Sequence, residues 1–258
     1  YDHIGPMART AWDCAAMLTV MAGADASDRT TVDRPAVDYV AALDRDLSNL
    51  RMGVVSNASI AKSASDAMLA VFDDAVAALA AGCHTEDFEV PLYDAMAEGT
   101  FLALQAEAFA WHRAQLRDRW EDYGRPTRLT IVQGALISAG DLVQIERVRH
   151  IARQQLIERM DAAGVDVLVS PTTGYAATPF TGADPKAVSM AAIHTPAWNS
   201  AGFPALSVPM GFDEDGLPCG LQIIGRPFAD DLVLAVGHHY QQLTDWHDRV
   251  APMHATAE

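Results

Sequence analysis

Few residues in the 258-residue sequence have a type and spacing that point to a known kind of catalysis. The sequence has no Gly-x-Ser-x-Gly elbow, no phosphate-binding glycine loop, no His-Glu-x-x-His helix and no Cys-x-x-Cys pair. A serine, a histidine and an aspartate can still form a triad, because its members meet only in space, but no pattern here favours one. We therefore predict that these residues hold no complete catalytic set.

Metal ligands and paired thiols are not indicated either. His238 and His239 are adjacent, so on a helix they point to different sides, unlike a metal-binding pair four residues apart. The three cysteines, Cys14, Cys83 and Cys219, are far apart and odd in number, which favours neither a disulfide framework nor a metal knuckle. We expect no metal and no cofactor, and a reducing compartment such as the cytoplasm.

Charge and the length of the apolar runs argue against two classes of partner, nucleic acids and membranes. The sequence has 34 acidic and 18 basic residues, a formal net charge of -16. Nucleic-acid binding needs clustered basic residues, whereas the only lysines are Lys62 and Lys186 and the arginines are interspersed with acids. No apolar run approaches the ~20 residues that span a bilayer. We predict neither a nucleic-acid partner nor a membrane partner.

The apolar pattern indicates alternating strands and helices. Helices are expected where apolar residues recur at helical spacing, at residues 12–21, 63–81, 94–122, 141–163 and 230–243. Strands are expected at short apolar or alternating runs between turn residues, at residues 51–56, 86–90, 165–170, 205–212 and 217–224. The strand, helix, strand order from Arg51 to Val90 is that of an α/β unit. The sequence Asp-Glu-Asp-Gly at 213–216 predicts a hairpin between the last two strands.

Three stretches of the sequence together carry a family resemblance. They are Asp2–Thr10 (DHIGPMART), Val165–Thr173 (VDVLVSPTT) and Thr195–Phe228, which contains AGFPALSV and GLQIIGRPF. Each piece alone has an ordinary explanation in turn residues, but in this order they resemble the amidase signature family. The resemblance implies an α/β fold with a mixed β-sheet sandwiched between helices. It also makes residues 1–258 the C-terminal part of a single amidase domain.

The resemblance implies where the reaction takes place. Family members use a Ser nucleophile, a second Ser joined through a cis peptide bond, and a Lys, all upstream of the segment that opens this chain. None of these has a counterpart here, and Lys62 and Lys186 have positions typical of solvated lysines. We therefore expect the chain to be a fragment or a processed product of an amidase, with the missing N-terminal half of the same protein as its partner.

On the same resemblance, this half contributes a wall of the substrate pocket. Residues after the Pro171 turn and those from Ile193 to Asn199 are expected near a bound acyl group, because ligands in such sheets lie beyond strand ends. The candidate residues for binding a small-molecule amide are Thr172, Ile193, Trp198 and Asn199. Trp198 could instead be ordinary core, and Asn199 a residue that caps a loop.

Two other functions remain open. Family members that act as the A subunit of tRNA-dependent amidotransferases hydrolyse glutamine, which they recognise through a basic and an acidic group. Arg128 matches the basic group, but the acidic position falls at Ala192, so an amidase that acts on small or aryl amides is preferred. The other alternative is a non-catalytic scaffold with amidase architecture. Without its other half the chain should expose strand edges and apolar surface, so we predict poor solubility or a homo-oligomer.

Overall fold

The computed structural model describes residues 1, 3–179, 182 and 192–251, and these contain a five-stranded mixed β-sheet. The strand order is β2-β1-β3-β5-β4. The strands are β1 (Arg51–Val55), β2 (His84–Phe88), β3 (Val167–Pro171), β4 (Ala205–Phe212) and β5 (Pro218–Gly225). β1 is parallel to β2 and β3, whereas β5 is antiparallel to β3 and β4. The predicted α/β unit and the predicted hairpin are both confirmed.

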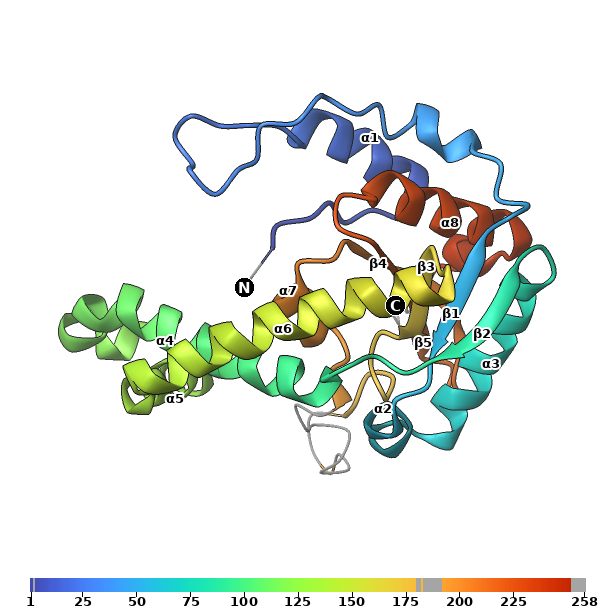
Figure 1. The fold of residues 1–258 in the computed structure, drawn as a ribbon. Coiled ribbons are helices and arrows are strands. Elements are labelled where there is room, and N and C mark those ends of the chain that lie inside the picture. The colour runs from blue at the N-terminus through green and yellow to red at the C-terminus, as the bar shows by residue number, and fades with distance from the viewer. Residues whose placement is uncertain (2, 180–181, 183–191, 252–258) are drawn as a thin grey trace, which may run out of the picture.

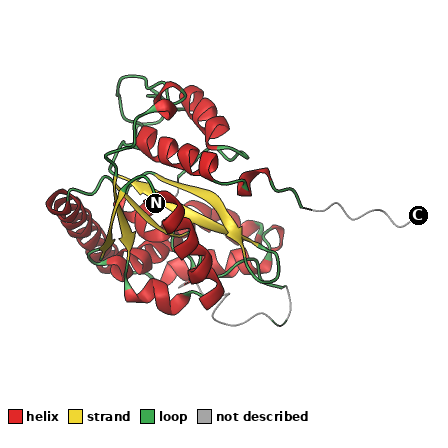
Figure 2. Ribbon diagram, turned by 90° about the vertical axis from the view of Figure 1, so that its right-hand side faces the viewer, coloured by secondary structure: helices red, strands yellow, loops and turns green. Residues whose placement is uncertain are grey.

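Helices cover both faces of this sheet (Figures 1 and 2). They are α1 (Ala11–Met21), α2 (Ala58–Ser63), α3 (Asp66–Ala80), α4 (Tyr93–Asp118), α5 (Arg125–Gln133), α6 (Ala139–Ala163), α7 (Pro196–Ala201) and α8 (Asp230–Leu243). In the fully buried β3, Val167 and Val169 pack with α3 and α8. Leu168 points to the other face and packs with α4, α6 and α7. This alternation places one apolar core on each side of the sheet, which confirms the predicted sandwich.

Local capping residues set the helix ends that position the site. The Thr10 hydroxyl accepts a hydrogen bond from the Asp13 backbone N–H at 3.0 Å and begins α1, as its sequence spacing predicts. Ser138 and Asp141 form a reciprocal capping box at the start of α6. α6 ends at Gly164, whose φ of 66° is in the left-handed region that favours glycine.

Three predicted boundaries were wrong. The helix predicted over residues 63–81 is α3, which begins three residues later, at Asp66, because the Ser65 hydroxyl accepts from the Met68 N–H at 3.1 Å; a separate short helix, α2, precedes it. The strand predicted over 86–90 begins earlier, at His84, because His84 pairs with Arg51 in the parallel ladder. The helix predicted over 94–122 ends at Asp118 and is followed by a separate 3-10 turn.

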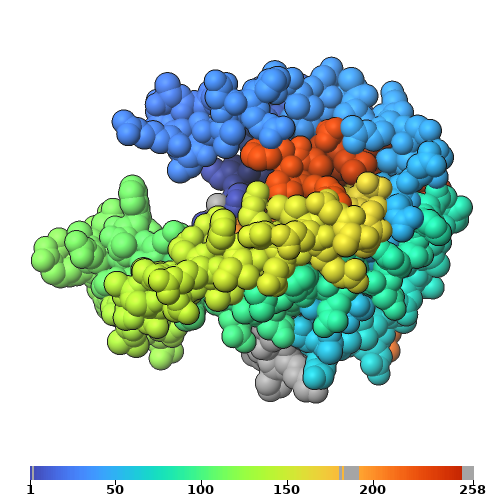
Figure 3. All heavy atoms as spheres, viewed as in Figure 1, coloured from blue at the N-terminus to red at the C-terminus, as the bar shows by residue number. Residues whose placement is uncertain are grey.

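The long helices extend to one side of the sheet. α4 and α6 run side by side, and α5 packs on α4 to form an arm (Figure 1). On the other side α1 packs on α8, together with a 3-10 turn at Ala41–Asp44. In the space-filling view the face is hollowed between residues 1–50 and the end of this arm (Figure 3). The arm and the N-terminal segment thus flank an open side of the molecule.

Candidate functional site

A buried histidine joins the end of β3 to α2. His194 Nδ1 lies 3.2 Å from the carbonyl oxygen of Pro171, and its Nε2 lies 3.0 Å from Ser63 Oγ. Because a carbonyl can only accept, Nδ1 bears the proton. The Ser63 hydroxyl oxygen, the partner of Nε2, also lies 2.8 Å from the Ser59 carbonyl oxygen. Burial lowers the pKa of His194, which favours the neutral ring with an unprotonated Nε2.

The backbone of His194 is held as firmly as its ring. Its N–H donates to the Thr172 carbonyl at 3.1 Å. Its carbonyl accepts from Gln222 Nε2 at 3.3 Å and from the Tyr93 hydroxyl at 3.4 Å. Gln222 Nε2 also lies 3.1 Å from Ser170 Oγ. These bonds connect β3, β5 and α4 to the segment that leads into α7.

The structure brings two predicted site residues, Thr172 and Ile193, together just beyond the end of β3. Residue 193 forms an isolated antiparallel bridge with Thr173, and Ile193 is 37% exposed. Thr172 donates its N–H to the Gly220 carbonyl at 2.8 Å, and its Oγ1 lies 2.7 Å from Ser207 Oγ. Thr172 is therefore tied to the β4–β5 hairpin, and Ile193 presents an apolar surface beside it.

Trp198, the third predicted residue, lies in the core beneath α7. It is 1% exposed, and its ring packs edge-on against Tyr93 with ring centroids 5.9 Å apart. Its buried Nε1 has no hydrogen-bond partner among the described residues. In the structure the Trp198 side chain contributes to the core, and its contact with a ligand stays a prediction.

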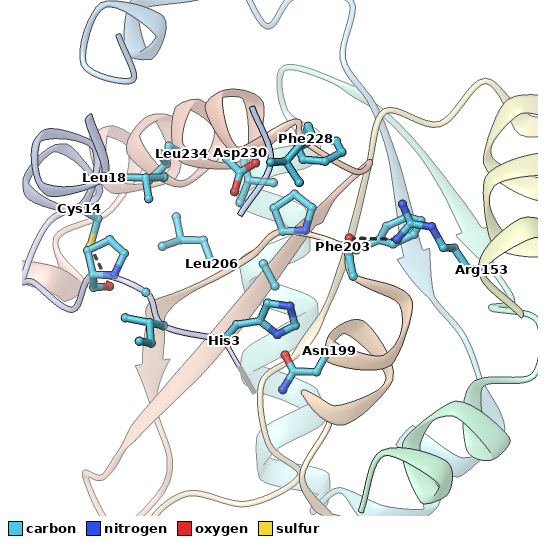
Figure 4. A pocket seen from close by; sticks show the side chains of 18 residues that line it. His3, Cys14, Leu18, Arg153, Asn199, Phe203, Leu206, Phe228, Asp230 and Leu234 are labelled. Carbon is cyan, nitrogen blue, oxygen red and sulfur yellow. Dashed lines mark hydrogen bonds between the residues drawn. The ribbon is translucent and has the colours of Figure 1, made fainter. Parts of the chain in front are cut away.

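Asn199, the fourth predicted residue, borders a cavity of about 600 Å³ (Figure 4). The cavity lies between residues 3–6, α1, the turn from α7 into β4, and the start of α8. Its apolar lining includes Leu18, Phe203, Leu206, Val233 and Leu234. A volume of this size and an apolar lining with few polar groups are typical of small-molecule sites. Thr172, Ile193 and Trp198 do not border it.

Two arginines of α6 hold the helix that presents Asn199. Arg149 Nε donates to the Ser200 carbonyl at 2.7 Å. Arg153 Nη1 donates to the carbonyls of Ala201 and Gly202, and Arg153 also borders the cavity. Cations at the last carbonyls of a helix satisfy acceptors that have no partner within it. The position of α7 therefore depends on α6.

The polar groups of the cavity include an acid and a thiol. Asp230, the first residue of α8, borders the cavity, and burial raises the pKa of its carboxyl group. Cys14 also borders it, and burial raises the pKa of its thiol. Since the thiolate is the nucleophile, Cys14 is held in its unreactive form.

Other chemical candidates lie away from this cavity. Lys62 is exposed on α2, as expected of a solvated lysine, and Lys186 lies outside the described residues. In the part of the chain that the structure describes, no group of three or more His, Cys, Asp or Glu side chains could hold a metal ion. Over the same residues, no helix has both the length and the apolarity needed to cross a membrane.

Arg128 and Ala192, the positions considered for glutamine recognition, have other surroundings. Arg128 Nη1 donates to the Trp120 carbonyl at 3.0 Å and to Glu121 Oε2 at 2.9 Å, and its guanidinium lies over the Trp120 ring. Ala192 is buried and apolar. Arg128 is thus occupied by contacts at the end of the arm.

Sequence reasoning missed Arg153 and Asp230, and it did not single out His194, although the predicted segment from Ile193 to Asn199 contains it. The sequence holds a partial signal for Asp230, because Asp230 and Asp231 follow a strand and start a helix. Only the folded structure shows which of the two acids faces a cavity. No sequence signal separates Arg153 from the other arginines of α6, since its role arises from contact with α7. The partners of His194 are likewise up to 131 residues away.

Comparison with known proteins shows the family to which the chain belongs. The sequence model described as Amidase matches residues 1–234. The chain is 34% identical over 275 residues to the A subunit of glutamyl-tRNA(Gln) amidotransferase from Methylococcus capsulatus, covering 96% of this chain and 56% of that protein. It is 37% identical to the protein of the same name from Roseiflexus castenholzii, with 96% and 55% covered. The chain therefore spans about half the length of the curated relatives it matches.

Solved structures show the same fold. A bacterial aryl acylamidase of the amidase signature family superposes with a TM-score of 0.79 at 21% identity, covering 95% of this chain and 53% of that one. The A subunit of glutamyl-tRNA(Gln) amidotransferase from Thermotoga maritima gives a TM-score of 0.72 at 26% identity, covering 91% and 51%. Both matches extend over nearly all of the sheet and helices described above.

Proposed function

The chain belongs to the amidase signature family, and from this premise we propose that it forms the substrate wall of an amide hydrolase. The nucleophile of that enzyme lies in polypeptide outside the 258 residues. Coverage of about half of each relative supports this division. The domain is then shared between this chain and an upstream half, and the chain on its own does not complete the reaction.

The observation that carries the proposal is that two of the three family-like stretches line one cavity. The first stretch supplies His3–Pro6 to its lining, and the last supplies Asn199, Gly202–Leu206 and Phe228. The middle stretch, which ends at Thr173, does not border the cavity but is hydrogen-bonded to His194, which lies in the segment that leads into α7. Segments far apart in the sequence thus build and support one small-molecule site.

The proposed reaction is acyl transfer from a carboxylic amide. A serine hydroxyl attacks the amide carbonyl and loses its proton to a base, ammonia or an amine leaves with a proton, and water then releases the acid. A lysine serves as that base when burial lowers its pKa. This chain contributes the cavity that holds and orients the substrate, and orientation alone supplies a large share of such rate enhancements.

A second candidate function is glutamine hydrolysis as the A subunit of a tRNA-dependent amidotransferase. The names of the curated relatives favour it. The surroundings of Arg128 and the apolar Ala192 speak against the pair of charges expected for glutamine. We therefore prefer an amidase acting on small or aryl amides in the cytoplasm. A scaffold without activity is the third possibility that the test below separates.

The test uses the chain joined to its upstream segment. Release of ammonia or amine from an aryl amide and from glutamine is measured for the intact protein and for variants of the upstream Ser and Lys. The proposal predicts hydrolysis of the aryl amide that those substitutions abolish. Hydrolysis that survives them would place the nucleophile elsewhere, and a folded protein without any activity would support the scaffold.

A further inference from the structure

We infer that Asp230 makes the cavity selective for amides that bear a positively charged amine in the part of the molecule held against α8. This inference rests on the proposed function, because it assumes that the cavity receives the amide substrate. It goes further by naming a chemical class of substrate and the residue that selects it.

Asp230 is placed where a ligand can reach it. It borders the cavity at the start of α8, across from Asn199 and beside Phe228 and Leu234 (Figure 4). The surrounding apolar side chains desolvate the carboxylate, and that desolvation is the largest cause of the upward shift in its pKa. A carboxylate that has lost water gains most from a cationic hydrogen-bond donor. The cavity therefore has a charged group whose natural complement is an ammonium.

The neighbouring acid differs in both position and partner. Asp231 does not border the cavity, and its Oδ2 lies 2.7 Å from Arg45 Nη2 in an ion pair. Within the described ranges, no hydrogen bond or ion pair joins the side chain of Asp230 to a basic group. Both acids stand in the first turn of α8, where negative charge stabilises the helix. The difference between them is thus access to the cavity.

The cations near the cavity offset the negative charge of Asp230 only in part. Arg153 borders the cavity, but its Nη1 donates to the carbonyls of Ala201 and Gly202. Arg34 lies on an exposed segment with its guanidinium 4.1 Å from the centre of the Phe228 ring, and its charge acts on Asp230 only weakly compared with burial. The other titratable neighbours are Tyr39, whose pKa is raised first by burial and then by the charges of Asp230 and Asp231, Asp231 itself, and His3, which also borders the cavity. Among the described residues, Arg34 is the cation whose charge acts on Asp230, and a substrate ammonium competes with it.

The experiment compares two amides of the same shape. In 5-aminopentanamide an ammonium takes the place of the terminal methyl group of hexanamide. Dissociation constants for both are measured by ligand-observed NMR on the chain joined to its upstream segment, with the upstream catalytic Ser replaced so that no turnover occurs. We expect 5-aminopentanamide to bind about tenfold more tightly, as a charge-assisted hydrogen bond predicts. Asp230→Asn should bring the ratio of the two constants to about one.

Two controls separate the effect of charge in the cavity from effects on helix α8 and on the neighbouring Arg34. Asp231→Asn removes the same charge from the same helix turn, and it should leave the tenfold preference intact. Arg34→Ala removes the competing cation and should increase the preference. Thermal unfolding checks that each variant is folded, and Asp230→Ser, which retains a helix-starting side chain, replaces Asp230→Asn if that variant unfolds.

The outcomes separate this inference from the proposed function. If both amides bind with equal affinity, or if Asp230→Asn and Asp231→Asn lower the preference alike, Asp230 is not the selecting residue while the cavity remains an amide site. If neither amide binds the folded protein, both the inference and the placement of the substrate in this cavity are wrong.

Discussion

At the scale of single residues, the neutral His194 holds together the segments that follow β3 and lead into α7. Its ring bridges the Pro171 carbonyl and the Ser63 hydroxyl, and its backbone is bonded to Thr172, a predicted binding residue. The lowered pKa favours the neutral ring, with its proton on Nδ1 facing the Pro171 carbonyl. Protonation of Nε2 would replace an acceptor by a donor that faces the same hydroxyl.

This dependence predicts a pH effect on stability. Burial lowers the pKa of His194 in the folded protein below the usual 6.5 of the unfolded chain. The unfolded state then binds more protons, so the unfolding free energy falls as the pH drops below about 6.5, by at most about 1.4 kcal/mol per pH unit. Urea unfolding of the wild type and of His194→Gln between pH 7.5 and pH 5 measures it.

The variant should lose that component of the pH dependence. His150→Gln, a change at an exposed histidine of α6, is the control and should retain it. Equal slopes for the wild type and His194→Gln would show that His194 is protonated in the folded state as readily as in the unfolded one.

At the scale of elements, α6 fixes the helix that presents Asn199. Arg153→Met keeps much of the aliphatic stem and removes the donor to the carbonyls of Ala201 and Gly202. We expect a loss of about 1 to 3 kcal/mol in unfolding free energy, since hydrogen bonds to charged groups are among the stronger ones. Denaturant unfolding measures it.

Arg147→Met on the same helix is the matched control. Arg147 is exposed, and its Nη1 donates to Gln144 Oε1 on its own helix. Its replacement should change the unfolding free energy by less than about 0.5 kcal/mol, as for most surface changes. Equal losses in the two variants would mean that Arg153 acts through α6 itself and has no special role in holding α7.

How much of these elements the sequence predicts depends on how local their causes are. β3 is readable because its apolar run lies between Gly164 and Pro171, and the hairpin because its turn sequence is strong. The position of β5 between β3 and β4 has no signal in the local sequence, because strand order depends on pairing between residues far apart in the chain. α7 is also too short for its period to be visible.

The same reasoning applies to the candidate site. The family resemblance predicts that Thr172, Ile193 and Asn199 lie near one bound acyl group. In the structure Asn199 borders the cavity, whereas Thr172 and Ile193 do not. Asp230 and Arg153 enter the site only through the packing of α8 and α6 against the turn after α7. A single sequence holds no record of such contacts, so these residues could be found only in the folded chain.

At the scale of the whole molecule, apolar side chains at the surface are the main sign of an absent partner. Ile4, Met7, Val20 and Leu136 are between 85% and 94% exposed. They lie on the N-terminal segment, on α1 and in the 3-10 turn Gly134–Leu136 between α5 and α6. Exposed apolar surface of this kind marks interfaces or promotes association.

The chain on its own should therefore self-associate. Analytical ultracentrifugation over a range of concentrations is expected to show oligomers or aggregates, and addition of the upstream segment should convert them to a species containing one copy of each part. A monomer at all concentrations with a sharp cooperative melt would show that the chain buries enough apolar surface by itself.

The central claim is that this chain builds the substrate wall while the nucleophile comes from polypeptide outside it. The most direct measurement labels the complete protein with an activated fluorophosphonate, which reacts with catalytic serines, and locates the modified residue by peptide mass spectrometry. We predict a label on a serine outside the 258 residues, with labelling slowed by an amide that fills the cavity at Asn199. A label on Ser63 beside His194, or on any other residue of this chain, would contradict it.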